Sequence, residues 1–161
     1  MVTNELERPS PHIPRWLVRT IWTIHRTAYA ATRGRFGLRE PGPRQWGMLR
    51  LTSVGRRTGQ RRVAILGYLE DGPNVVVPAM NGWAEPEPAW WLNLQANPAA
   101  TVELPTGKRT MVARAATPDE RARLWARFVG LGSSAYTNAN ARLRTRETAV
   151  VVLEPLPNVA R

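Results

Sequence analysis

The sequence of 161 residues contains no cysteine, and it contains only two histidines, His12 and His25. The lack of cysteine excludes disulfide bonds, catalytic thiols and thiolate metal sites. Neither histidine belongs to a cluster with metal-ligand spacing, so we predict no metal site. The same shortage argues against a Ser–His–Asp hydrolase.

Long apolar runs are also missing, because no stretch of about 18 apolar residues occurs. The first 14 residues are polar and contain prolines, and they lack the charged-then-apolar order of a signal peptide. We therefore predict no transmembrane helix and a cytoplasmic protein. At 161 residues the chain is long enough for one domain with a substantial core.

Lysine is nearly absent, since all but Lys108 of the 23 basic residues are arginine. The formal net charge is +11 at pH 7, which favours anionic partners such as nucleic acid, an acidic membrane face or an anionic cofactor. A basic nucleic-acid-binding module without enzymatic activity is one alternative. We find no helix-turn-helix, RNA-binding strand motif or zinc finger, so no nucleic-acid partner is expected.

The chain divides into two predicted parts, residues 1–37 and residues 38–161. Apolar residues recur at helical spacing from about residue 13 to 32, with arginines on another face, so we predict a basic amphipathic helix followed by a linker. Such a helix either lies on an anionic membrane surface, at the inner face of the membrane, or packs on protein. The sequence leaves both alternatives open, together with the oligomeric state.

Residues 38–161 have a β-rich pattern that predicts an α+β fold. Strands are predicted at 46–54, 62–69, 75–80, 99–104, 109–115 and 149–153, with helices at 87–97 and 117–128. Thr117 is the predicted N-cap of the second helix, with Pro118 at its first position and Glu120 at its third. About six mostly antiparallel strands favour a small closed or nearly closed barrel with peripheral helices.

The most informative segment is the turn at residues 55–62, which follows an apolar strand and contains two glycines, two polar side chains and four arginines. Backbone N–H groups of such a turn can form a concave anion site, and arginine adds planar paired donors. The turn therefore predicts a site for a polyanionic ligand. A solvated basic hairpin turn is the alternative.

A second motif, Pro88-Ala89-Trp90-Trp91-Leu92-Asn93-Leu94-Gln95-Ala96-Asn97-Pro98, lies about one hairpin later. Together the two motifs resemble the deazaflavin-dependent nitroreductase family, which uses coenzyme F420. The resemblance covers about residues 49–128, with a weaker echo at 149–155. It implies a split β-barrel and an oxidoreductase that transfers hydride from reduced F420 to an electron-poor hydrophobic acceptor, such as a quinone, an enone or a nitroaromatic.

The resemblance also implies roles for individual residues. The phosphodiester and the anionic oligoglutamate tail of the cofactor would be held by Arg56, Arg57, Gln60 and Arg62. The deazaflavin ring would contact the backbone at Pro78, Ala79 and Met80, and the helix residues Ala89, Trp90 and Asn93. Ala89 and Asn93 share a helix face, and we predict that only one of Trp90 and Trp91 faces inward.

The chain also departs from the family pattern. Relatives often have Ser-Lys-Gly-Gly where this chain has Met80-Asn81-Gly82-Trp83, and Gly67 stands where an aromatic residue is frequent. Tyr136 and Ser134 are the candidates for hydrogen bonding to the substrate or for proton donation. A family member with lost or altered activity, or an FMN- or haem-type ligand in the same barrel, are the remaining alternatives.

Overall fold

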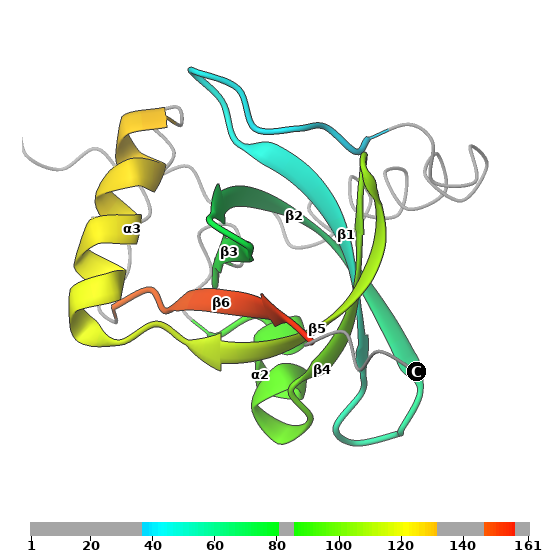
Figure 1. The fold of residues 1–161 in the computed structure, drawn as a ribbon. Coiled ribbons are helices and arrows are strands. Elements are labelled where there is room, and N and C mark those ends of the chain that lie inside the picture. The colour runs from blue at the N-terminus through cyan, green and yellow to red at the C-terminus, as the bar shows by residue number, and fades with distance from the viewer. Residues whose placement is uncertain (1–36, 81–85, 132–146, 157–161) are drawn as a thin grey trace, which may run out of the picture. The chain divides into compact units, whose positions relative to one another are not determined.

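The computed structural model describes residues 37–80, 86–131 and 147–156. Six antiparallel strands close a barrel in the order β1-β2-β3-β6-β5-β4, with two helices outside the sheet (Figure 1). The strands are β1 (Gly47–Val54), β2 (Arg61–Asp71), β3 (Asn74–Pro78), β4 (Ala99–Leu104), β5 (Gly107–Ala115) and β6 (Val150–Pro155), and the helices are α2 (Ala89–Ala96) and α3 (Pro118–Leu131). The predicted α+β barrel is therefore confirmed.

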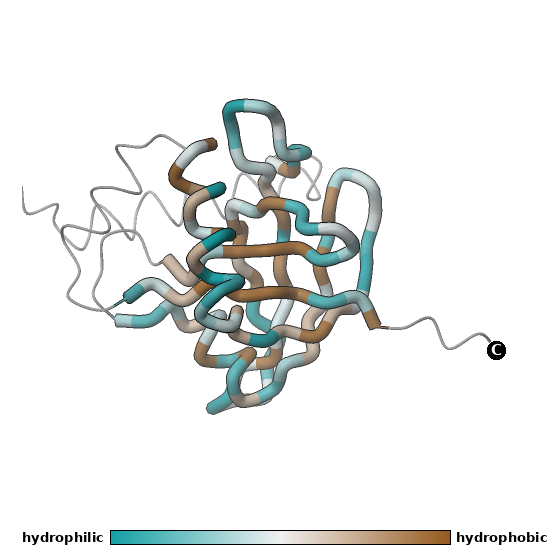
Figure 2. Tube along the Cα trace, turned by 60° about the vertical axis from the view of Figure 1, so that its left-hand side comes forward, coloured by the Kyte–Doolittle hydropathy of each residue, from teal (hydrophilic) through white to brown (hydrophobic). Residues whose placement is uncertain are grey.

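The barrel interior is formed by alternate residues of each strand. In β1, Leu49, Leu51 and Ser53 are buried, while Thr52 between them is half-buried and lies on the outer face. In Figure 2, apolar stretches lie in the strands of the barrel, and hydrophilic residues gather at the turns. The period of two along β1 is the pattern expected of strands with one face toward a core. The valine run of β3 is an exception, because Val76 packs on the outer cluster beneath α3 and all three valines are buried.

The α2 helix packs into one end of the barrel. Trp90, Trp91 and Leu94 of this helix belong to the same apolar cluster as the barrel interior. Trp90 and Trp91 are only 7% and 5% exposed, so the prediction that just one of them faces inward is wrong. Successive helix residues are about 100° apart, and a helix that plugs a barrel mouth has core on more than one side.

The α3 helix covers the outer face of β2, β3 and β6. Its Leu124 and Phe128 pack with Leu69, Val76 and Val152 in a second apolar cluster. The predicted N-terminal cap is confirmed, because the Thr117 N–H donates to Glu120 Oε2 at 2.9 Å and the Glu120 N–H donates to Thr117 Oγ1 at 3.4 Å. The helix continues to Leu131, beyond the predicted end at residue 128.

The strand boundaries differ from the prediction at the ends. The β3 strand ends at Pro78 rather than at residue 80, because the Met80 N–H turns back to the Pro78 carbonyl at 2.8 Å. The β2 strand begins one residue earlier and ends two residues later than predicted, and β6 runs on to Pro155. Cross-strand pairing extends each of them beyond the apolar run that signalled it in the sequence.

The described residues from 38 onward belong to one compact unit. The predicted helix at 13–32 lies outside the described residues, so the division of the chain at residue 37 stays a prediction. Within 37–80, 86–131 and 147–156, neither helix is long and apolar enough to cross a membrane.

Candidate functional site

The turn between β1 and β2 is closed by its own hydrogen bonds. The Gly55 N–H donates to the Gln60 carbonyl at 2.8 Å, and the N–H groups of Thr58 and Gly59 donate to the Gly55 carbonyl. Gly59 has a φ of +66°, which L side chains rarely adopt, so glycine is required at this position. The sequence folds here into a tight, defined loop that presents its side chains outward.

Most backbone N–H groups of this turn already have partners and are not free to form the predicted anion-binding concavity. The N–H groups of Gly55, Arg56, Thr58, Gly59 and Gln60 all have partners within the protein. A concave anion site requires N–H groups that point at the ligand without a partner. Attraction for an anion at this turn therefore comes from its side chains.

Asn93 connects the two sequence motifs. Its Oδ1 accepts the backbone N–H of Arg56 at 3.1 Å and the guanidinium Nη1 of the same residue at 3.3 Å. Asn93 is 5% exposed, and a buried amide oxygen of this kind needs a donor. The contact holds the arginine turn against α2 at one end of the barrel, where Figure 1 also places both segments.

The arginines of the turn carry unpaired charge. Among the residues that the structure describes, no carboxylate lies within ion-pair distance of Arg56, Arg57, Arg61 or Arg62, whereas arginines elsewhere in the barrel have such partners. The side chains are exposed at the rim of the barrel end. Arg62 Nη2 lies 3.5 Å from Thr58 Oγ1, a hydroxyl that the sequence analysis did not single out. This concentration of unneutralised guanidinium groups fits a phosphate- and carboxylate-bearing ligand.

Trp90 lies on the α2 helix, one turn before Asn93, and its indole is buried. Its Nε1 has no hydrogen-bond partner in the structure. A buried indole N–H usually finds an acceptor, and leaving it without one is unfavourable. The N–H of Trp90 is thus a buried donor without an acceptor, on the same helix as the residue that holds the arginine turn.

The segment after β3 has few backbone N–H groups left to bind a ligand. The Ala79 N–H donates to the Ala149 carbonyl at 2.8 Å, and the Met80 N–H is taken by Pro78. Pro78 and Ala79 are buried, and Met80 is half-buried. A ligand that met this segment would have to use the carbonyl groups or the Met80 side chain.

Other predicted positions divide into those that fit and those that do not. Ala89 is exposed, so it does not share the buried environment of Asn93. At Gly67 an added Cβ would lie 2.9 Å from Trp46 Cε3, which explains why this chain has glycine where an aromatic is frequent. Trp46 packs edge-to-face on Phe128 and donates its Nε1 to the Phe128 carbonyl at 3.0 Å.

The two predicted catalytic residues, Tyr136 and Ser134, lie outside the described residues, as do Asn81 and Trp83. No group of three or more His, Asp or Glu side chains that could hold a metal occurs within residues 37–80, 86–131 and 147–156. Desolvation by burial, the largest of its causes, raises the pKa of Tyr68 to about 12. Tyr68 thus stays a neutral core side chain at physiological pH.

Comparison with known proteins identifies the family. The model of the F420H2-dependent quinone reductases matches residues 22–155. The chain belongs to this family. It is 33% identical over 147 residues to an F420H2-dependent quinone reductase of Mycobacterium tuberculosis, with 88% of this chain and 97% of that protein covered.

Solved structures agree on the fold. The structure of an F420H2-dependent reductase (FDR-A) matches with a TM-score of 0.60 and 23% identity, covering 75% of this chain and all of that one. A chain described as a domain-swapped dimer matches with a TM-score of 0.61 and 23% identity, covering 84% of this chain and 99% of that one. Membership of the quinone reductase family confirms the predicted enzyme class and its dependence on coenzyme F420.

The described residues fit such a cofactor on three observations. The turn carries unpaired guanidinium groups, α2 carries the unpartnered Nε1 of Trp90, and Asn93 fixes the two relative to each other. An anionic cofactor with an aromatic head group needs this combination of charge at one end and apolar wall at the other. The sequence motifs predicted the arginines and Asn93 as site residues. That the Trp90 N–H lacks a hydrogen-bond acceptor could be seen only in the structure.

Proposed function

We propose that this protein transfers hydride from reduced F420 to a quinone. The observation that carries the proposal is the contact between Asn93 and Arg56, which joins both family motifs into one site. The deazaflavin supplies the hydride chemistry when it is bound. The protein has to bind the cofactor, orient its ring and keep water away from it.

We assign the charged part of the cofactor to Arg56, Arg57, Gln60 and Arg62. Support for this assignment comes from the exposure of these side chains and from the lack of described carboxylates beside the arginines. Guanidinium groups bind phosphate and carboxylate oxygens in pairs.

We assign the ring of the cofactor to the end of β3 and to α2. Pro78, Ala79 and Met80 would face one part of the ring, and Ala89, Trp90 and Asn93 another. The apolar mouth formed by Trp90 and its cluster excludes water, which protects a hydride donor from side reactions. The acceptor would be a hydrophobic molecule for the same reason.

Reduction of a quinone by hydride leaves an oxyanion that must take up a proton. Tyr136 and Ser134 are our candidates to donate it or to hydrogen-bond the acceptor, and they lie outside the described residues. Enones and nitroaromatics are the other acceptor classes that such a site would reduce. The preferred acceptor class is decided by comparing the rates at which the protein reduces a quinone, an enone and a nitroaromatic with reduced F420.

The experiment that tests the function has two steps. First, F420 is titrated into the purified protein and followed by its fluorescence, with FMN as competitor. We expect binding that FMN does not displace. Second, oxidation of reduced F420 is followed with menadione as acceptor, and a protein that binds F420 but never oxidises it in the presence of any of the three acceptor classes would contradict the proposal.

A membrane role of the N-terminal segment is a separate prediction from its basic amphipathic sequence. It is tested by sedimentation with vesicles that contain anionic lipid, comparing the full chain with a chain that starts at residue 34. We expect the full chain to sediment and the shortened chain to stay in solution. Equal sedimentation of both would exclude this role for the segment.

A further inference from the structure

The three residues before β6, 147–149, connect α3 with the end of β3. On the side of α3, the Thr148 carbonyl accepts a hydrogen bond from Arg121 Nε at 3.0 Å. Two residues later, the Val150 carbonyl accepts the N–H of Ala116, just before α3, at 2.8 Å. Successive carbonyl groups of an extended chain point to opposite sides, so these two bonds tie one side of the segment to α3.

The other side of the segment holds the end of β3. The Ala149 carbonyl accepts the Ala79 N–H at 2.8 Å, and Ala149 also packs against the apolar cluster of the barrel interior. Pro78 belongs to the last pair of the ladder between β3 and β6 and has no N–H, so Ala79 supplies the next donor. The bond between Ala79 and Ala149 therefore fixes the point at which the chain leaves β3.

Arg121 is itself held by its surroundings. Its guanidinium carbon lies 5.7 Å from the centroid of the Trp125 ring, four residues later on α3, and one of its nitrogens pairs with Glu147. The side chain of Arg121 is 22% exposed, and Thr148, whose carbonyl it binds, is 6% exposed. A charged donor to a carbonyl in such a place is stronger than an exposed ion pair. The bond to Thr148 is therefore the main contact that Arg121 makes.

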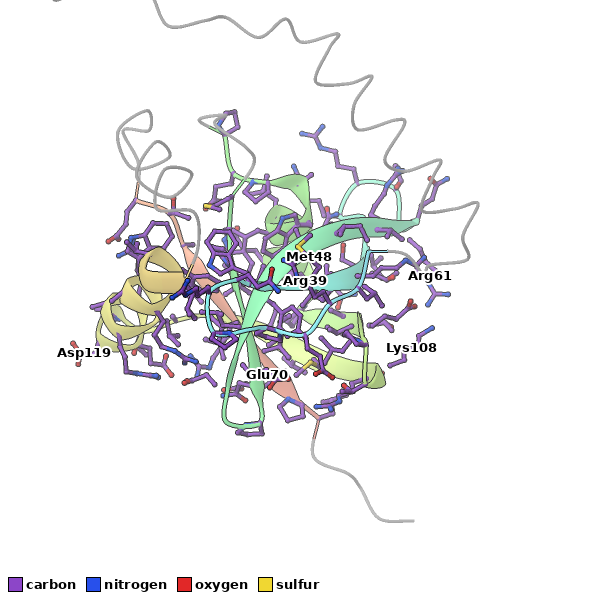
Figure 3. All side chains as sticks on the ribbon, turned by 90° about the horizontal axis from the view of Figure 1, so that it is seen from above. Arg39, Met48, Arg61, Glu70, Lys108 and Asp119 are labelled. Carbon is purple, nitrogen blue, oxygen red and sulfur yellow. The ribbon has the colours of Figure 1, made fainter. Side chains whose placement is uncertain are left out.

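Arg121 lies far from the arginine turn. Figure 3 shows Asp119, two residues before it on α3, on the opposite side of the barrel from Arg61. Arg61 begins β2, directly after the turn. An effect of Arg121 on cofactor binding would therefore be transmitted through residues 147–149 and the end of β3.

We propose that Arg121 is a positioning residue for the deazaflavin ring. It holds the Thr148 carbonyl, and the next carbonyl along the chain holds Ala79, in the segment 78–80 to which we assign one part of the ring. Hydride transfer needs its two partners at a close and defined distance, so a small shift of this segment lowers the rate. The inference rests on the proposed function, because the assignment of the ring to the end of β3 belongs to it.

Arg123 is the matched control, two residues further along the same helix. It also forms a charged pair, but its hydrogen bonds go to Asp71 at the end of β2 and not to residues 147–149. Arg121→Gln and Arg123→Gln each remove one charge from α3, and urea unfolding measures the stability of both. If Arg121→Gln does not fold, Arg121→Lys takes its place, because it keeps a cation beside Trp125 and loses the directed Nε–H.

The first measurement needs no cofactor. Amide hydrogen exchange of the full chain is followed by NMR, and the rate at Ala79 reports how firmly its bond to Ala149 is held. The rate at Leu51, a fully buried residue of β1, corrects for changes in overall stability. We expect Arg121→Gln to raise the corrected rate at Ala79 about fivefold and Arg123→Gln to leave it unchanged. Equal corrected rates in the two variants would overturn the inference.

The second measurement separates the ring from the charged part of the cofactor. Fluorescence polarisation measures binding of F420 and of the same deazaflavin without phosphate and tail. We expect Arg121→Gln to weaken binding of both compounds by the same factor, about fivefold. It should also lower kcat with menadione at saturating reduced F420. Arg62→Ala, in the turn, should weaken binding of F420 alone.

Normal binding of both deazaflavins and a normal kcat in Arg121→Gln would overturn the inference and leave the proposed function intact. So would equal weakening of the tailless compound by Arg121→Gln and Arg123→Gln, since lost stability and not the end of β3 would then be the cause. Binding of neither deazaflavin by the unmodified protein would instead contradict the proposed function, and the role of Arg121 toward the ring would fall with it. The exchange rate at Ala79 would still show whether Arg121 holds this end of β3.

Discussion

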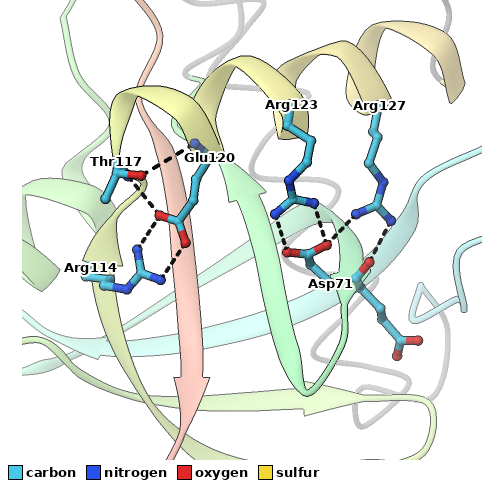
Figure 4. A network of polar contacts seen from close by, with 7 residues as sticks. Asp71, Arg114, Thr117, Glu120, Arg123 and Arg127 are labelled. Atoms are coloured by element: carbon cyan, nitrogen blue, oxygen red, sulfur yellow. Dashed lines mark hydrogen bonds and ion pairs between the residues drawn. The ribbon is translucent and has the colours of Figure 1, made fainter.

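Arginine has two different environments on opposite parts of this barrel. Around α3, arginines are paired: Arg123 and Arg127 both bind Asp71, with Nη to Oδ distances of 2.8 Å, and Arg114 binds Glu120 at 2.7 Å (Figure 4). In the turn between β1 and β2, Arg56 and Arg62 have no carboxylate partner among the described residues. Arginine therefore stabilises the fold through ion pairs around α3, whereas in the turn its charge is left without a carboxylate partner among the described residues.

The difference follows from where the acids are. Asp71 ends β2 and faces α3, so two guanidinium groups from successive helix turns reach one carboxylate. The turn at 55–60 contains no acidic residue. Within the described part of the chain, the side-chain acceptor that another element offers to this turn is Asn93, which is neutral and leaves the positive charge in place. Free charge at the barrel end is therefore a property of the local sequence, and it is what an anionic cofactor requires.

The largest effect that this comparison predicts comes from removing two charges from the turn. Arg56→Ala with Arg62→Ala should weaken F420 binding about 100-fold, since two charge-assisted contacts are lost. The urea midpoint should stay close to that of the unmodified protein, because neither side chain forms an ion pair with any residue that the structure describes. Both quantities are measured on one sample, by fluorescence titration and by circular dichroism.

The matched control removes two charges from the other region. Arg123→Ala with Arg127→Ala should lower the urea midpoint and leave F420 affinity unchanged. If both double variants weaken F420 binding equally, net charge alone attracts the cofactor, and the division between the two arginine environments has no functional meaning.

The sequence predicts the unpaired arginines of the turn better than it predicts the paired arginines around α3. The turn arginines and Asn93 belong to short motifs with fixed spacing, so local sequence was enough to find them. The link between Asp71 and Arg123 spans more than fifty residues, and only the closure of the barrel brings α3 to the end of β2. Long-range pairing of this kind leaves no periodic signal in the chain.

Other differences have local causes that the sequence pattern did not carry. The burial of both Trp90 and Trp91 depends on α2 entering the barrel mouth, whereas amphipathic periodicity describes a helix that lies on a surface. The unoccupied hydrogen-bonding capacity of Ser53 and the Trp90 N–H depends on exact placement of neighbours. Barrel class, strand count and the N-terminal cap of α3 were predictable, because turn residues and alternation mark the strands and the Thr117–Glu120 spacing marks the cap.

A smaller effect is expected from Asn93→Ala, which tests whether the turn must be held against α2. The variant removes the acceptor of the Arg56 N–H, so we expect a loss of about 1–2 kcal/mol in the free energy of unfolding. F420 affinity should fall about tenfold, because Arg56 is no longer held in place. Gln95→Ala, an exposed change on the same helix, is the control and should alter neither quantity. Loss of stability with unchanged F420 affinity would show that the Asn93 contact is only structural.

Asp71→Asn sharpens the comparison from the paired side. The carboxylate holds two guanidinium groups at the surface, so we expect a loss of about 1 kcal/mol in unfolding free energy at neutral pH. Hydrogen bonding from Arg123 is the main cause that lowers the pKa of Asp71 in the folded state. The difference between the two proteins should therefore shrink as acid protonates Asp71, and it should shrink in high salt. An Asp71→Asn protein with normal stability but weak F420 binding would reverse the assignment of the two regions.

The smallest effect concerns acid stability at the start of α3. The guanidinium of Arg114 is the main cause that lowers the pKa of Glu120 from 4.5 to about 2, helped by the Thr117 N–H of the helix cap. Because the folded-state pKa lies below the unfolded one, the stabilisation is complete above pH 4.5 and is lost as the pH falls toward 2. The Glu120→Gln protein should not show this loss of stability between pH 4.5 and 2. Urea unfolding at a series of pH values measures the difference. An acid transition that is the same in both proteins would mean that the cap and its ion pair do not contribute to it.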